Sequence, residues 1–252
     1  MSAARSAGAV RSEGAARDRV GLLRCGHVHP RLLPGGDYPE RFRALLEPAG
    51  LAVQDFDADE GDLPASVDDC AGWLLTPSRS SLTAPEPWMG PLVDFVDELI
   101  ASQRRVAGVC FGHQLLAAVG GGRVERAAEG WGVGVHDYEV VADPTGSGAP
   151  PAVGGIRLVA SHEDQVVAPP PGAEVFLRSP HCPIAGFRVG RRVLGVQPHP
   201  ELSAADAATL IDARADLLGP ATVAAARSTL KATPDQAVAG GWLAGFLAGD
   251  GG

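Results

Sequence analysis

A single cysteine between two glycines, where a short apolar run meets a helical pattern, constrains this chain most. Residues 106–109 have the apolar character of a buried strand, and an apolar helical pattern occupies residues 114–119. Cys110 therefore falls on a sharp strand-to-helix turn, the geometry of a nucleophile elbow. Gly108 and Gly112 suit such a turn, because it needs backbone freedom and leaves no room for bulk beside the nucleophile.

The elbow by itself leaves two interpretations of Cys110 open. A thiol at a helix N-terminus lies at the positive end of the helix dipole, which favours the nucleophilic thiolate. The other interpretation is a buried structural cysteine, since free cysteine is among the residues most often found in protein cores.

A second segment, residues 195–201 (GVQPHPE), favours the nucleophile. It follows a short apolar strand at 193–196 and places His199 and Glu201 two residues apart. In extended chain these side chains point the same way, so the carboxylate can hold one ring nitrogen while the other faces a thiol. A cysteine nucleophile needs such a base, and the base needs an orienting group. Together, the two segments predict a catalytic triad.

Four motifs in this order resemble those of the class I, triad-type glutamine amidotransferase family. They are 109–114 (VCFGHQ), 130–134 (GWGVG), 161–166 (SHEDQV) and 197–201 (QPHPE). The resemblance runs from about residue 20 to about residue 215. It is greatest to free-standing members similar to the amidotransferase domain of GMP synthetase, among them γ-glutamyl peptidase-like proteins. It implies hydrolysis of a γ-glutamyl amide through a cysteine thioester, without a metal or organic cofactor.

The resemblance assigns the catalytic roles and one oxyanion-hole donor. Cys110 matches the nucleophile, His199 the base and Glu201 its orienting acid. The backbone N–H of Phe111 matches an oxyanion-hole donor, which must lie just past the nucleophile. If His199 is not the base, His162 and His181 are the next candidates.

Three further residues match substrate-binding positions of the family. Gln114 matches the glutamine that positions the substrate, although a polar residue in the first turn of a helix is the alternative. Ser161 and His162 match a segment whose backbone meets the α-amino and α-carboxylate groups, although an ordinary strand-end turn would look the same. Asp164 belongs to the same motif and has no assigned role.

The chain departs from the family in the loop that supplies the second oxyanion-hole donor. A glycine-rich loop is expected there, but residues 74–81 read LLTPSRSS, with Pro77 in place of a glycine. Proline has no N–H, so the donor is assigned to Ser78. If Pro77 presents this amide poorly, Pro77→Gly raises activity; if Pro77 pre-sets the loop, the glycine variant is unchanged or slower. A second departure is Pro198, where the family often has an aromatic residue.

The composition limits which partners we expect for this chain and in which cellular compartment we expect it. A net charge of −9 argues against non-specific binding to nucleic acid or anionic membranes. Four scattered cysteines without a CxxC pair fit a reducing compartment, so we expect a cytoplasmic protein. No apolar run approaches the roughly 20 residues of a membrane helix, and residues 1–18 lack the apolar core of a secretory signal.

Alternating strand and helix patterns predict a doubly wound α/β fold, a mostly parallel sheet flanked by helices. The resemblance implies the flavodoxin-like arrangement of class I amidotransferases. We expect a disordered tail at 1–18, the amidotransferase-like domain at 19–218, and an Ala-rich helical extension at 219–252. Expected strands are 20–23, 51–56, 71–75, 106–109 and 193–196, with short strands between 122 and 196; expected helices are 38–46, 91–102, 114–119, 203–218, 221–230 and 236–247.

The resulting prediction is a cysteine-dependent glutamine amidotransferase or glutaminase acting on glutamine or another γ-glutamyl compound. Any acceptor synthetase is expected to be a separate chain. The alternatives are a γ-glutamyl peptidase and, because of Pro77, a non-catalytic regulatory subunit on the same scaffold. His27 and His29 are spaced to chelate a metal ion, but spacing fixes no third ligand, so no metal is expected.

Overall fold

The computed structural model describes residues 19–146 and 154–249 and is built around a nine-stranded sheet. The tail expected at 1–18 lies outside the described residues. The strand order is β2-β1-β3-β4-β11-β10-β9-β6-β7, and a separate two-stranded sheet pairs β5 (Arg123–Arg126) with β8 (Asp164–Ala168). No helix in the described part of the chain is both long and apolar enough to cross a membrane.

The first five strands in this order are mutually parallel and form the centre of the α/β fold. They are β2 (Val53–Phe56), β1 (Val20–Leu23), β3 (Gly72–Leu75), β4 (Arg105–Val109) and β11 (Val193–Val196). The order of these strands is that of doubly wound flavodoxin-like sheets, so the predicted fold class is confirmed. In such sheets, ligands bind beyond the carboxyl ends of the strands. Cys110 and the 197–201 segment follow directly after β4 and β11.

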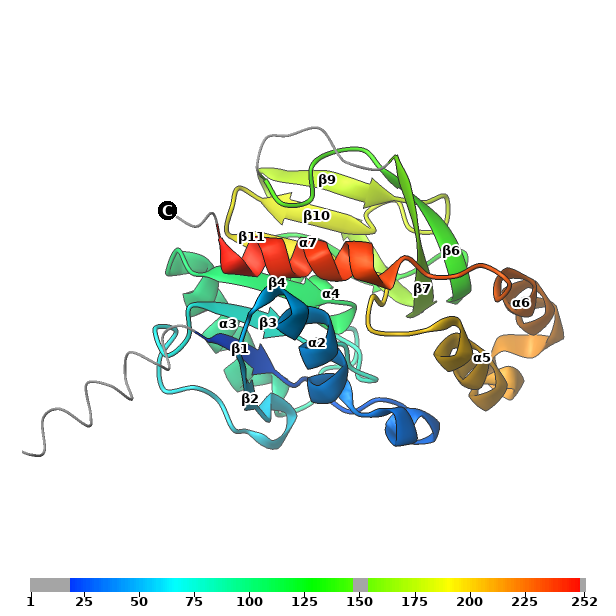
Figure 1. Cartoon of the computed structure of the whole chain (residues 1–252), viewed down its shortest axis with the longest axis horizontal. Helices are drawn as coiled ribbons and strands as arrows, with labels where there is room; N and C mark the ends of the chain where they lie inside the picture. Colours follow the sequence, from blue (N-terminus) through cyan, green and yellow to red (C-terminus); the bar gives the residue numbers. More distant parts are fainter. Residues whose placement is uncertain (1–18, 147–153, 250–252) are drawn as a thin grey trace, which may run out of the picture.

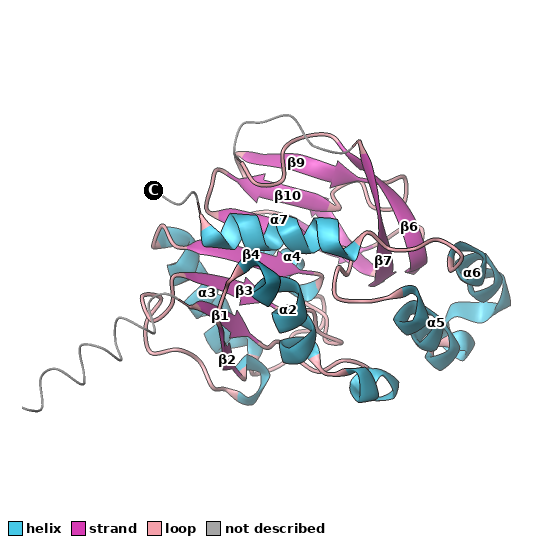
Figure 2. Ribbon diagram, in the orientation of Figure 1, coloured by secondary structure: helices cyan, strands magenta, loops and turns pink. Residues whose placement is uncertain are grey.

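The remaining four strands extend the sheet in antiparallel fashion (Figure 2). They are β10 (Gly186–Val189), β9 (Ala173–Arg178), β6 (Gly132–Val140) and β7 (Gly155–His162). This half contains the short strands expected between 122 and 196. It brings the end of β7 to the catalytic edge, because an isolated bridge pairs Val159 with His199.

Helices cover both faces of the parallel half, and each face has its own core. Helices α2 (Tyr38–Leu46) and α7 (Gln236–Ala248) cover one face, whereas α3 (Met89–Ala101) and α4 (Phe111–Val119) cover the other (Figure 1). Successive strand residues point to opposite faces. Accordingly, Leu22 packs in the core with α2 and α7, and Leu23 in the core with α3 and α4.

Helix boundaries follow local capping signals. Asp37 forms a capping box with Glu40 at the start of α2, and Ser203 forms one with Asp206 at the start of α5 (Ala204–Ala213). Short 3-10 turns, η1 (Pro30–Gly35), η2 (Glu47–Ala49) and η3 (Ala58–Glu60), lie in the loops flanking α2 and following β2.

The single helix predicted at 203–218 is wrong. Helix α5 ends at Ala213, and α6 (Ala215–Thr229) begins after Arg214, whose φ of −114° and ψ of 13° are not helical. A kink at Gly219, with φ of 75°, and Pro220 then divides α6 itself. A glycine is required here because positive φ is unfavourable for other residues, and proline removes a helical hydrogen bond.

Candidate active site

Cys110 occupies a tight turn between β4 and α4, as the elbow motif predicts. Its φ of 51° and ψ of −102° lie outside the regions that non-glycine residues normally adopt. Its amide donates to the carbonyl oxygen of Val196 at 2.9 Å, and its own carbonyl oxygen accepts from the amide of Gln114 at 3.0 Å. The surrounding hydrogen bonds therefore hold a strained residue, a feature that is concentrated at functional sites.

The two elbow glycines are needed because other backbone atoms pass close to them. A Cβ on Gly108 would lie 2.4 Å from the carbonyl carbon of Gly112, and one on Gly112 would lie 2.5 Å from the carbonyl oxygen of Leu75. These contacts let α4 start directly above β4 and beside β3. Bulkier residues at either position would displace Cys110.

His199 and Glu201 form a buried pair at the end of β11. His199 Nδ1 lies 2.7 Å from Glu201 Oε1, and the Glu201 side chain is fully buried. The amide of His199 donates to the carbonyl oxygen of Val159 in β7 at 2.8 Å, which fixes the backbone of this segment. His199 Nε2 has no hydrogen-bond partner of ordinary geometry among the described residues.

The surroundings of His199 favour its protonated form. Burial by itself lowers the pKa of His199, but the Glu201 carboxylate and the neighbouring Cys110 sulfur together raise this pKa to about 10. A buried histidine with a raised pKa has the properties of a general acid.

Six of the eight predicted site residues line one pocket of about 190 Å³, and His199 and Glu201 are not among them. Its lining includes every predicted oxyanion-hole and substrate-binding residue together with the nucleophile: Ser78, Cys110, Phe111, Gln114, Ser161 and His162. Phe111 is the first residue of α4, so its amide has no partner within the helix and is free to donate. His199 lines an adjoining small cavity that shares Ser78 and Ser161 with the pocket.

This geometry, a strained cysteine elbow beside a buried His–Glu pair, agrees with the comparison with known families. The family model for class I glutamine amidotransferases matches residues 48–213. This chain belongs to the class I glutamine amidotransferase family.

The family members that this chain resembles include γ-glutamyl peptidases, GMP synthases and glutamine amidotransferases of known structure. γ-Glutamyl peptidase 2 of Arabidopsis thaliana is 28% identical over 169 residues, covering 66% of this chain and 68% of that protein. The glutamine-hydrolysing GMP synthase of Pyrobaculum aerophilum is 31% identical over 168 residues, covering 67% of this chain but 31% of that protein. The structure of a glutamine amidotransferase from Methylobacillus flagellatus has a TM-score of 0.68 at 21% identity, covering 92% of this chain and 93% of that one. This last likeness supports the fold.

Gln114 holds part of the amidotransferase pocket in place. Its Nε2 donates to the carbonyl oxygen of Asp164 at 2.8 Å and to Gln197 Oε1 at 3.0 Å. These bonds link α4, the 161–166 motif and the 197–201 motif. The Asp164 side chain accepts a hydrogen bond from Ser81 in the oxyanion loop. Asp164 therefore connects two loops that line the pocket.

The surroundings of His162 favour its neutral form. Burial and the nearby His181 and His199 rings lower the pKa of His162 to about 3. Its Nδ1 lies 3.1 Å from the carbonyl oxygen of Asp164, and its ring meets that of His181 edge-on at 5.9 Å. Of the three histidines considered as the base, His199 has the partner that a triad base requires.

Hydrogen bonds and burial tie the loop that contains Pro77 to the rest of the fold. Thr76 Oγ1 accepts from the amide of Cys25 at 2.9 Å and donates to the carbonyl oxygen of Pro77 at 3.0 Å. Pro77 itself is buried, and Ser78 lines the pocket beside Cys110. The loop packs closely on Gly26, where a Cβ would lie 2.8 Å from Ser78 Oγ.

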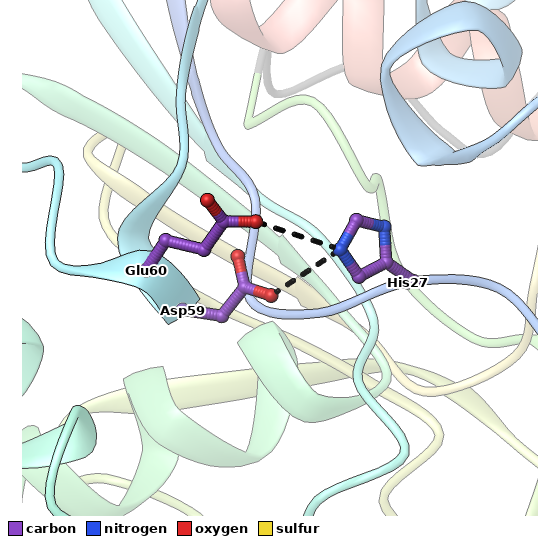
Figure 3. A group of neighbouring side chains, drawn as sticks. All are labelled: His27, Asp59 and Glu60. Carbon is purple, nitrogen blue, oxygen red and sulfur yellow. Dashed lines mark ion pairs between the residues drawn. The ribbon is translucent and has the colours of Figure 1, made fainter.

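His27 and His29, whose spacing would suit chelation, do not lie in one cluster. His27 lies near Asp59 and Glu60 (Figure 3), with its Nε2 3.8 Å and 3.9 Å from their carboxylate oxygens. The Arg24 guanidinium already pairs with both carboxylates, at 3.1 Å and 2.8 Å. His29 is not part of this cluster and lines the small cavity instead. The positive charge beside these two carboxylates is therefore that of Arg24.

The sequence analysis missed three arginines that line the pocket, Arg79, Arg126 and Arg214. Arg79 and Arg214 both line the pocket and the small cavity beside His199. Arg79 lies two residues beyond Pro77, so the oxyanion loop offered a positional clue. Arg214 offered none, because its place depends on the break between α5 and α6.

Proposed function

We propose that this amidotransferase hydrolyses γ-glutamyl amides by covalent catalysis at Cys110. The observation that carries the proposal is the elbow cysteine beside His199, whose second ring nitrogen is held by Glu201 at 2.7 Å. The pocket containing Ser161, His162 and Gln114 would take the glutamyl head group.

In the first half-reaction the thiolate of Cys110, whose proton His199 has taken, attacks the carbonyl carbon of the γ-amide. The backbone N–H groups of Phe111 and Ser78 stabilise the negative oxygen of the tetrahedral intermediate. The carbon–nitrogen bond then breaks, and His199 donates its proton to the departing nitrogen. The products of this step are an amine or ammonia and a γ-glutamyl thioester.

In the second half-reaction water replaces the amine. His199 takes a proton from water while the oxygen attacks the thioester carbonyl, and the carbon–sulfur bond breaks to release glutamate. Glu201 holds the imidazole in the required orientation and stabilises its charged form.

Steady-state hydrolysis of glutamine and of a panel of γ-glutamyl amides tests this function, with Cys110→Ser as the control. Release of glutamate by the parent chain but not by the serine variant is expected. Glutamine hydrolysis that rises on addition of a separate synthetase chain would support a role in ammonia transfer. Turnover of γ-glutamyl peptides alone would support the γ-glutamyl peptidase alternative. Absence of turnover on every γ-glutamyl compound would support the non-catalytic subunit instead.

A further inference from the structure

The small cavity beside His199 has the size of a single water site. It measures about 20 Å³. A bound water needs roughly 10–15 Å³ of such space and two to four polar neighbours, so the cavity has room for one water but not for an amino acid. Ser78, Ser161 and Arg214 line both this cavity and the pocket that contains Cys110, so the two spaces adjoin at these residues.

Polar side chains from several segments of the chain line this cavity. Arg214 Nη1 donates to Ser161 Oγ at 2.6 Å, which leaves the hydroxyl proton of Ser161 available to a further acceptor. Tyr38, the first residue of α2, and His199, which follows β11, line the cavity as well. These four side chains supply as many polar neighbours as a buried water requires.

The side chains around the cavity lie close to the nucleophile. Burial, the first cause, and then the charges of Glu201 and Cys110 raise the pKa of Tyr38 well above its ordinary value. Burial lowers the pKa of both His199 and Arg214, and the Cys110 sulfur opposes this effect in each case. Three groups that line the cavity are therefore within electrostatic range of the sulfur that would carry the thioester. Hydrolysis needs its water here, because His199 must take a proton from the water while the oxygen attacks.

We infer that this cavity binds the water that hydrolyses the thioester, and that the Tyr38 hydroxyl holds this water beside His199. The inference rests on the proposed function and gives water its own route in the second half-reaction. After the amine has left, neutral His199 takes a proton from the water, and the water oxygen bonds to the thioester carbonyl carbon. The carbon–sulfur bond then breaks, which gives glutamate and the Cys110 thiolate. An amine larger than ammonia does not fit the cavity and reaches the thioester through the open pocket.

The test measures how the thioester divides between water and an added amine. Methoxyamine, which is larger than the cavity, converts the acyl-enzyme to γ-glutamyl methoxyamide, whereas water converts it to glutamate. Both products are quantified for the parent chain, Tyr38→Phe and Tyr138→Phe at one methoxyamine concentration, and a rapid-quench burst of released amine measures acylation. Tyr138→Phe is the matched control, because Tyr138 is also a buried tyrosine but lines neither the pocket nor the cavity.

In Tyr38→Phe we expect the ratio of methoxyamide to glutamate to rise roughly 3- to 10-fold, as for loss of one hydrogen bond to the attacking water. The acylation burst of this variant and the product ratio of Tyr138→Phe should match those of the parent chain. The Tyr38 ring packs against Phe42, with ring centroids 6.4 Å apart, and the phenylalanine variant keeps this contact.

An unchanged ratio in Tyr38→Phe would overturn the inference and leave the proposed function intact, and so would an equal rise in Tyr138→Phe. A weaker acylation burst with an unchanged ratio would give Tyr38 a role in the first half-reaction instead. If Tyr38→Phe does not fold, Val28→Ile provides the same test, because Val28 lines the cavity and one added methylene would take the space of the water. If the parent chain formed no acyl-enzyme, the proposed function would fail together with the inference.

Discussion

The backbone N–H of His199 donates to the carbonyl oxygen of Val159 at 2.8 Å. This bond joins the two halves of the sheet at the catalytic edge, because His199 follows parallel strand β11 and Val159 belongs to antiparallel strand β7. Cys110 is thus placed by the parallel half of the sheet, whereas His199 is held by both halves. The same bond holds the end of β7 at this edge of the sheet, where Ser161, two residues beyond Val159, lines the pocket.

Replacing the nucleophile should separate folding from catalysis. Cys110→Ser should keep the fold and lose roughly 1000-fold or more in the rate of γ-glutamyl amide hydrolysis, as when a member of a catalytic triad is deleted. Glutamate release and circular dichroism measure the two properties. Full activity of the serine variant would contradict the mechanism.

Alkylation should distinguish Cys110 from the other cysteines. All four are free and buried, and burial raises the pKa of Cys70 to about 11 and that of Cys182 to about 12. Burial raises the pKa of Cys25 as well. A glutamine-like chloroketone or diazoketone should therefore label Cys110 and spare the other three, as read by peptide mass spectrometry. Labelling at another cysteine would place the nucleophile elsewhere.

Replacing His199 should slow thioester formation more than replacing Glu201 does. His199→Ala should abolish thioester formation, because no other group then moves the proton. Glu201→Gln should leave a partial rate, since its role is orientation and charge stabilisation. Rapid-quench detection of the acyl-enzyme measures both, and negligible effects of both changes would move the base to His162 or His181.

The raised pKa of His199 should appear in the pH dependence of stability. His199 binds its proton more tightly in the folded chain, with a pKa of about 10, than at its ordinary value of 6.5. Its contribution to stability is therefore complete below about pH 6.5 and is lost as the pH rises through about 10. Urea unfolding at pH 7 to 10 should show a steeper fall for the parent chain than for His199→Gln. Parallel curves would rule out the raised pKa.

We expect Pro77 to give a more stable and more active protein than glycine at the same position. Because Thr76 and burial already fix the loop, Pro77→Gly should mainly increase the entropy of the unfolded chain. It should lower stability by about 0.4–1 kcal/mol and slow turnover slightly. Thermal unfolding and steady-state rates measure these effects, with Ser78→Ala as a control that retains the backbone N–H. A faster Pro77→Gly variant would show that the proline misplaces the Ser78 amide.

The elbow should not accept a methyl group on Gly112. A Cβ there would lie 2.5 Å from the carbonyl oxygen of Leu75, so Gly112→Ala should destabilise the fold by about 1–3 kcal/mol. Gly90→Ala, in helix α3 with no atom within 4 Å of the added carbon, should be neutral or stabilising by up to about 1 kcal/mol. Equal midpoints of urea unfolding for the two variants would contradict this close approach.

Local sequence patterns predicted individual helices and strands better than they predicted the contacts between them. The strand before Cys110 and the helix after it are encoded within a dozen residues, and so is the spacing of His199 and Glu201. The break at Arg214 was missed because alanine-rich sequence on both sides favours helix, and only tertiary contacts to Ser161 and Trp131 oppose it. The pairing of Val159 with His199 joins distant segments and has no local signal.

Helix α7 begins outside the part of the chain that matches the family, yet Gln236 Nε2 donates to the carbonyl oxygen of Pro200 at 3.0 Å, between the base and its acid. Leu243 and Phe246 of the same helix are buried against the sheet. The folded unit that supports the candidate site is therefore longer than the segment that the family model matches. Insertions or fusions that displace helix α7 would therefore also disturb the His199–Glu201 pair, which lies near the first residue of this helix, Gln236.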